Sequence, residues 1–184
     1  RVAVGLEGSG MQVSAAKVLN HYQLKVERRS VSFRALLTDE TLDAAIVTSG
    51  IFSADLREVL IDERFVLLPV EDAVAFEVKH FFFQSATIPV GLYSEKPYST
   101  PSEELKTIST TASVVVGQDA NEQLIEAILG TIYESELRQE FPLLMDRDEA
   151  AELSTLRLHP ASRKYFFPQD RSEEHTSELQ SRTN

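Results

Sequence analysis

Short apolar runs alternate with stretches of helical spacing through residues 1–100, and this alternation constrains the fold more than any other feature of the chain. Each run has the length of a single strand. Helices between successive strands are typical of a parallel sheet, because a parallel connection must cross back over the sheet. The sequence therefore predicts an α/β fold with strands at 2–5, 24–31, 44–48 and 65–70.

Several predicted helices begin at a residue that can cap them. Ser9 and Gln12 have the capping-box spacing, in which each side chain pairs with a backbone N–H that the helix start leaves without a partner. Asp119 and Glu122 repeat this spacing before a helix that we expect to reach residue 134. Further helices are expected at 33–37 after Ser32, behind Ser53, at 72–79, and at 136–152 with a break at Pro142.

An aromatic, turn-rich segment after residue 80 marks a change in organisation. It leads into a loop rich in serine, threonine and glutamate, and then into a β-prone stretch at 108–116. We therefore expect a domain boundary here, between one domain at 1–104 and a segment of one strand and several helices at 105–170.

The two ends of the sequence both look artificial. Arg1 stands where a start methionine is expected, and a strand-like run follows it at once, so we expect that the N-terminus is missing. The residues from Arg171 to Ser181 are those that the common adapter of short-read sequencing libraries would encode. We therefore expect 171–184 to be a disordered artefact and set it aside in reasoning about the fold.

Charge and composition argue against several classes of function. The chain has 18 basic and 29 acidic residues and a net charge of -11, so its general field repels nucleic acid. No apolar run approaches the roughly 18 to 20 residues of a membrane-spanning helix. The absence of cysteine removes disulfides and thiol chemistry, but it fits an oxidising compartment as well as a reducing one.

The most informative motif is the glycine-rich turn after the first strand, where Gly8, Ser9 and Gly10 precede Met11. Glycines at this point allow a tight turn and expose the N–H groups of a helix start, which attract anions. One interpretation places a carboxylate or phosphate against Ser9 and the amides of Gly10 and Met11. The other is an ordinary strand-to-helix turn.

Two further places are candidates for the same site. Thr48, Ser49 and Gly50 repeat the arrangement at the end of the third strand, and strand ends that share one edge of a parallel sheet line one crevice. Tyr93 follows Gly91 on a loop, where its phenol would either reach a ligand or pack at a hinge.

No catalytic, metal or cofactor motif is present in the sequence. The glycine order G-x-x-G-x-G differs from the dinucleotide fingerprint, and the phosphate-loop, zinc-protease and serine-hydrolase motifs are absent. His21, His80 and His159 are isolated in sequence, so we expect them to be capping or surface residues. We therefore expect no enzymatic activity, no metal and no cofactor.

Four stretches in a fixed order resemble the TAXI family of TRAP-transporter solute receptors: 2–10, 42–46, 88–93 and 158–166. The resemblance implies a type 2 periplasmic-binding-protein fold, in which two α/β lobes close on a small organic anion such as glutamate or a dicarboxylate. It also implies a periplasmic protein that presents this carboxylated solute to the subunits of a membrane permease. The chain would then begin at the second lobe, truncated at its N-terminus and without its signal peptide. The resemblance implies that 1–104 is this ligand-binding lobe and that 105–170 returns to the first lobe.

The resemblance also implies roles for individual residues. Gly8, Ser9 and Gly10 match the family's loop against the ligand carboxylate, and Tyr93 matches a tyrosine near the hinge; the segment from Thr48 to Gly50 is a weaker match. The family usually has His-Pro-Gly-Ala where this chain reads His-Pro-Ala-Ser from His159, and we interpret His159 as structural.

The same fold leaves other functions open, because fold alone does not determine function. The chain is alternatively the ligand-sensing domain of a regulator, which would carry an upstream helix-turn-helix, or the framework of an enzyme. A receptor tethered to the membrane by a segment after Phe167 is a further alternative.

Overall fold

The computed structural model describes residues 1–94, 99–141, 143–152 and 157–168. It divides into two compact units, Arg1–Ala112 and Ser113–Asn184. We describe each unit by itself.

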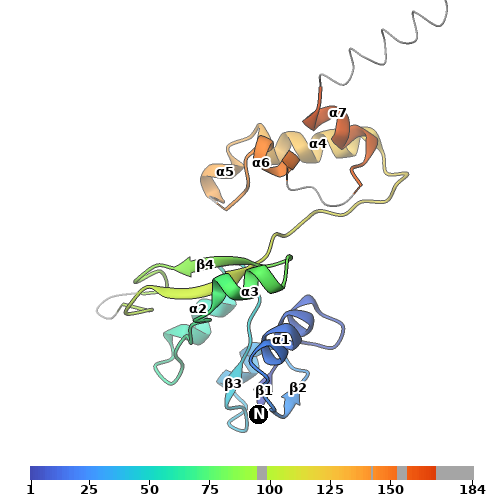
Figure 1. The fold of residues 1–184 in the computed structure, drawn as a ribbon. Helices are drawn as coiled ribbons and strands as arrows, with labels where there is room; N and C mark the ends of the chain where they lie inside the picture. The colour runs from blue at the N-terminus through green and yellow to red at the C-terminus, as the bar shows by residue number, and fades with distance from the viewer. Residues whose placement is uncertain (95–98, 142, 153–156, 169–184) are drawn as a thin grey trace, which may run out of the picture. The chain divides into compact units, whose positions relative to one another are not determined.

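The first unit contains a three-stranded parallel sheet, as the sequence predicts. β1 (Val2–Ala3) lies between β2 (Arg28–Arg29) and β3 (Ala44–Ala45). Figure 1 shows the three strands side by side. Backbone hydrogen bonds extend the pairing beyond the strands, from Gly5 N to Val31 O at 3.1 Å and from Ile46 N to Ala3 O at 3.0 Å.

The chain at β1 and directly after it is covered on both faces of the sheet. Successive residues of a strand point to opposite faces, and Ala3 and Val4 accordingly belong to two different core clusters. The first cluster brings Ala3 together with buried side chains of the segment 33–42 and of α2 (Ala54–Ile61). The second packs Val4 against Ala15 and Leu19 of α1 (Gly10–His21). The sheet is therefore covered by helical segments on both sides.

The expected serine caps are confirmed. The side chains of Ser9, Ser32 and Ser53 each accept a hydrogen bond from a backbone N–H at the start of α1, of the 3-10 helix η1 (Phe33–Leu37) and of α2. These contacts span two or three residues, so the local sequence is enough to specify them.

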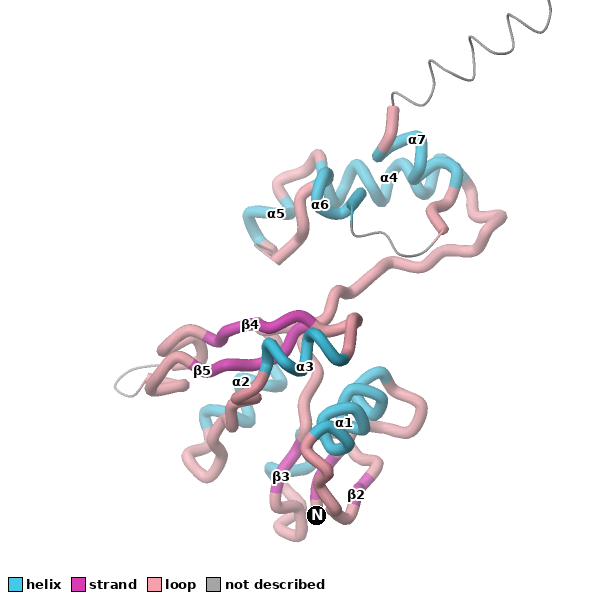
Figure 2. The backbone as a smooth tube through the Cα atoms, viewed as in Figure 1, coloured by secondary structure: helices cyan, strands magenta, loops and turns pink. Residues whose placement is uncertain are grey.

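The rest of the first unit is a helix packed on a hairpin. α3 (Ala73–Lys79) contacts β4 (Gln84–Ile88) and β5 (Leu105–Ser109), which pair antiparallel from Gln84 opposite Ser109 to Ile88 opposite Leu105. Phe76 is fully buried, and its ring lies 5.2 Å from that of Phe83. Figure 2 shows the two long strands of this hairpin beside α3.

The expected strands differ from those in the structure. Residues 65–70 form no strand, and Val66 and Leu68 are 76% and 77% exposed. Among the described residues, the one backbone hydrogen bond from this segment to the hairpin is that of Val70 N to Lys106 O. The strand expected at 108–116 instead runs from Leu105 to Ser109, and 110–116 are exposed without regular structure. A β-prone sequence needs a partner strand, and β4 offers none beyond Gln84. The strands expected at 2–5, 24–31 and 44–48 are likewise shortened to β1, β2 and β3.

The second unit is helical. Its elements are α4 (Glu122–Tyr133), α5 (Leu137–Glu140), α6 (Arg147–Glu152) and α7 (Pro160–Phe166). Ile125 and Leu129 of α4 pack against Ala161 of α7 in its core. The helix expected at 136–152 is divided into α5 and α6; Pro142, where we expected the break, lies outside the described residues.

The cap of α4 differs from expectation. Asn121, not Asp119, accepts hydrogen bonds from the backbone N–H of Gln123 at 2.8 Å and of Leu124 at 3.2 Å. Asn121 directly precedes the helix in extended backbone, which is the geometry that a capping residue requires.

The expected domain limits are not those of the compact units. β5 begins at Leu105 and pairs with β4, so the first unit continues past residue 104 to Ala112. The segment 171–184, expected to be an artefact, lies outside the described residues.

Candidate functional site

Two of the expected site segments follow the ends of parallel strands. β1 leads into the glycine-rich turn, and β3 leads towards Thr48, Ser49 and Gly50. Because the strands are parallel, both segments leave the sheet at its carboxyl edge, which is where open α/β sheets bind ligands.

The turn after β1 requires glycine at two positions. Gly5 and Gly8 have φ of +90° and +74°, in the left-handed region that other residues rarely adopt. A Cβ atom on Gly5 would lie 2.8 Å from Met11 Cβ and 2.9 Å from Ser9 Oγ. The turn is therefore closed tightly against the start of α1.

Ser9 and Gln12 form a variant of the expected capping box. Ser9 Oγ accepts from Gln12 N at 3.3 Å, while Gln12 Oε1 accepts from the N–H of Gly8, at 3.0 Å, and not from that of Ser9. Ser9 N donates instead to Leu6 O at 3.1 Å. Gln12 Nε2 also donates to Ser30 Oγ at 3.2 Å, which connects the helix start to the segment after β2.

This arrangement leaves hydrogen-bond donors at the helix start. Gly10 and Met11 are the first two residues of α1, and amides at these positions have no carbonyl within the helix to bond. The Ser9 hydroxyl accepts one bond as a cap, and its own hydrogen is free to rotate towards an acceptor. The positive end of the helix dipole adds to the attraction for an anion.

The second candidate segment lies at the start of α2. Thr48, Ser49 and Gly50 are exposed, and Gly50 O accepts from the N–H of Ser53, the capping residue of α2, at 3.0 Å. The structure thus places two capped helix starts after neighbouring parallel strands, β1 and β3.

Tyr93 lies in the loop between β4 and β5 and is 6% exposed. Its N–H donates to Thr100 O at 2.9 Å, and burial raises the pKa of its phenol. Among the described residues, no hydrogen bond or ring contact connects Tyr93 with residues 8–11 or 48–50. The structure therefore does not join it to the carboxyl edge of the sheet.

A polar cluster that the sequence did not predict connects α1 with α3. His21 Nε2 lies 2.7 Å from Asp72 Oδ2, and the Tyr22 hydroxyl donates to Asp72 Oδ1. These hydrogen bonds hold the pKa of Asp72 below its ordinary value, whereas burial and then the hydrogen bond to Asp72 raise the pKa of Tyr22 to about 12. The His21 and Asp72 positions are 51 residues apart, so no local spacing signals their contact.

His80 completes this cluster. Its ring lies 5.8 Å from that of His21, and the buried ring of Phe76 contacts both. Burial, and then the charge of Lys17, lower the pKa of His80. His21 and His80 are therefore not isolated in the folded chain, although no group of three potential ligands in the described part of the chain is placed to hold a metal.

His159 has the structural role that we expected. Its Nδ1 accepts from Ala161 N at 3.2 Å, so its side chain caps α7, and Pro160 occupies the first turn of that helix.

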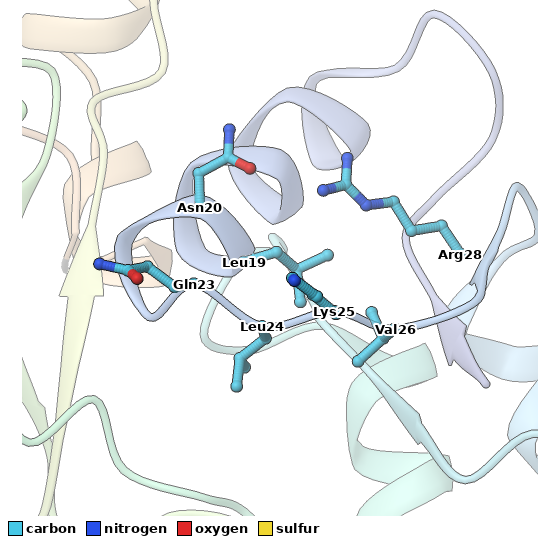
Figure 3. A pocket seen from close by; sticks show the side chains of 7 residues that line it. All are labelled: Leu19, Asn20, Gln23, Leu24, Lys25, Val26 and Arg28. Carbon is cyan, nitrogen blue, oxygen red and sulfur yellow. The ribbon is translucent and has the colours of Figure 1, made fainter.

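A hollow of about 470 Å³ lies away from the glycine turn, between the carboxyl end of α1 and the segment before β2 (Figure 3). Its lining combines apolar side chains with amides and two cations; the residues are Leu19, Asn20, Gln23, Leu24, Lys25, Val26 and Arg28. No helix among the residues that the structure describes has the length and apolar character to cross a membrane.

A parallel sheet with helical segments on both faces and a tight glycine turn at its carboxyl edge is typical of α/β proteins that bind small ligands. A comparison with models of known protein families identifies the family to which this ligand-binding chain belongs. The model of the NMT1-like family matches residues 1–168, and the chain belongs to this periplasmic-binding-protein-like family of substrate-binding proteins. Proteins of this kind are usually extracytoplasmic. No curated protein matches the chain.

Proposed function

We propose that the chain is the ligand-binding lobe of a TAXI-type solute receptor, which captures a small carboxylated solute for a TRAP-type membrane permease. The observation that carries the proposal is the glycine turn that leads into the capped start of α1, at the carboxyl edge of the parallel sheet. The chain that holds this turn belongs to a substrate-binding family. The four sequence stretches at 2–10, 42–46, 88–93 and 158–166 support the narrower family.

The solute's carboxylate would accept hydrogen bonds from the Ser9 hydroxyl and from the amides of Gly10 and Met11. Hydroxyls of Thr48 and Ser49, after the neighbouring strand, would contact the rest of the solute. The net charge of -11 does not oppose an anionic ligand, because helix termini and hydroxyls determine the local potential of a site.

Transport would follow from closure of two lobes. A ligand shifts a protein towards the closed state only through the extra contacts that it makes there. The partner lobe would precede Arg1 in the complete, periplasmic protein, and Tyr93 would lie near the hinge. The permease would then recognise the closed form.

We propose binding without chemical conversion of the solute. The turn from Gly5 to Gly10 offers the Ser9 hydroxyl and backbone amides, which recognise a carboxylate. Its one titratable side chain is Glu7, and the turn holds no second acid or base to act with it.

The test is calorimetric titration of the complete protein, recovered from the source DNA, with glutamate and a panel of dicarboxylates. We expect Ser9→Ala to lower the affinity about fivefold, which corresponds to the loss of one hydrogen bond of about 1 kcal/mol. Asn121→Ala is the matched control, because it removes the cap of α4, a helix of the same length as α1 in the other unit. Equal affinities of wild type and Ser9→Ala would exclude Ser9 from the site, and release of a modified solute would indicate an enzyme.

A further inference from the structure

We propose that the exposed apolar side of α3 binds a second copy of this chain, so that two α3 helices pack antiparallel in a weak dimer. This side of the helix, together with the turn after it, is called the α3 surface. Its residues are Val74, Ala75, Val78, Phe81 and Phe82. α3 meets α1 at His21, the end of α1 opposite the glycine turn, so the dimer does not involve the proposed solute site.

The opposite side of α3 is already occupied. Ala73 and Phe76 are buried, and Glu77 Oε2 accepts a hydrogen bond from the backbone N–H of Ser85 in β4 at 2.8 Å. Figure 1 shows α3 lying along the hairpin of β4 and β5, which it contacts. These contacts determine which residues of the helix face outwards.

The α3 surface is apolar although it is exposed. Val74 and Val78 are 68% and 82% exposed, and they lie one helical turn apart. Phe81 and Phe82, in the turn after the helix, are 81% and 66% exposed. A surface helix normally presents polar residues to solvent, whereas a helix that is apolar on all sides is buried. This side of α3 therefore has the composition of an interface.

Two charged residues at the ends of α3 favour a second copy as the partner. Glu71 precedes the helix and Lys79 ends it; both are exposed, and neither takes part in a salt bridge between described residues. In an antiparallel pair, the Glu71 end of each helix lies beside the Lys79 end of the other. The same arrangement brings Val74 of one copy beside Val78 of the other. The α3 surface is therefore complementary to itself.

Other occupants fit this surface less well. Helices that lie on membranes carry lysine and arginine beside their apolar face, whereas Glu71 and a net charge of -11 repel anionic lipid. A small molecule needs a concave site, and the exposed side of a helix is convex.

The dimer should be weak and reversible. Stable interfaces bury about 1,200 to 2,000 Å² in total, and a seven-residue helix with one turn reaches only the lower end of this range. We therefore expect a dissociation constant of about 1 μM or weaker.

The experiment is sedimentation velocity of the complete protein over a series of concentrations. We expect the mass to rise from one copy to two as the concentration increases. Val78→Glu should weaken the dimer about tenfold or more, because it places a charge between apolar side chains. Val66→Glu is the matched control, since it makes the same change at a valine of the same unit that is 76% exposed. It should alter the dissociation constant less than about twofold.

An exchange of charges tests the antiparallel arrangement. Glu71→Lys and Lys79→Glu should each weaken the dimer about threefold or more, because each places like charges at both ends of the helix pair. The double variant should recover most of the affinity, since it restores opposite charges. Thermal unfolding of each variant shows whether it is folded.

The proposal fails if the protein is a monomer at every concentration, if Val66→Glu weakens the dimer as much as Val78→Glu, or if the double charge variant is no better than the single ones. Binding of phosphatidylglycerol vesicles by a monomer would also overturn it. Ser9→Ala should leave the dimer unchanged. Loss of solute binding in a protein that still dimerises would therefore count against the proposed receptor function alone.

Discussion

His21 on α1 and Asp72, the residue before α3, meet with 2.7 Å between Nε2 and Oδ2. The His21 side chain is only 4% exposed, so the carboxylate satisfies a nitrogen that water scarcely reaches. α1 starts at the glycine turn, and this contact fixes its other end to the helix that packs on the hairpin.

Removal of the Asp72 carboxylate should destabilise the first unit. We expect Asp72→Ala to lower the urea midpoint of unfolding, because it leaves His21 and the Tyr22 hydroxyl without their acceptor. The measurement is urea denaturation. Glu71→Ala removes the neighbouring exposed carboxylate and serves as the control. Equal unfolding midpoints for the two variants would show that the contact adds nothing.

His80 should make stability depend on pH. Burial and nearby cations lower its pKa in the folded chain, so the unfolded chain binds the proton more readily. The contribution of neutral His80 is complete above its ordinary pKa of 6.5 and is lost as pH falls towards the folded value. Urea midpoints should therefore decrease as pH drops below 6.5, and less so in His80→Asn. A slope that is unchanged in His80→Asn would contradict this prediction.

Asp72 should also make stability depend on pH, but in a more acidic range than His80. Its folded pKa is depressed, so its stabilising effect is present above 3.8 and disappears as pH falls further. His80 and Asp72 therefore act in separate pH ranges of one denaturation series, and of these two ranges Asp72→Ala should change the pH dependence in the more acidic one.

The glycine turn should tolerate a methyl group at one position and reject it at another. Gly5→Ala would combine a left-handed φ with contacts of 2.8 and 2.9 Å, so we expect it to destabilise the chain by about 2–4 kcal/mol. Gly10 has open space around it and helical backbone, so Gly10→Ala should unfold at or above the wild-type midpoint. Thermal denaturation of the two variants makes the comparison, and similar losses in both would contradict the tight closure of the turn at Gly5.

The segment between the units should be an early site of proteolysis. Residues 110–117 are exposed and have no regular structure, and Val114 and Val115 offer thermolysin its preferred apolar side chains. Brief digestion followed by mass spectrometry should show a cut within this segment. Survival of the segment after the cores of both units are cleaved would contradict its exposure.

The sequence predicted those features that depend on neighbours along the chain. The caps at Ser9, Ser32 and Ser53 depend on contacts within three residues, and the parallel sheet follows from the alternation of strands and helices. Residues 65–70 and 108–116 were predicted less well, because a strand depends on a partner that propensity does not reveal.

In the candidate site, too, the local features were predictable from the sequence and the long-range contacts were not. The turn at Gly8 and the helix start at Ser9 lie where the glycine pattern placed them, and their role in binding an anion stays a prediction. The contact of His21 with Asp72 depends on how α3 packs, so no spacing could reveal it.

The pairing of β1 with both β2 and β3 also sets an order of events during synthesis. All three strands lie within residues 2–45, so the ribosome has released every sheet partner before the hairpin of β4 and β5 is made. Within the first unit, the turn at Gly5 is therefore translated together with all three strands of its sheet, before the hairpin on which α3 packs.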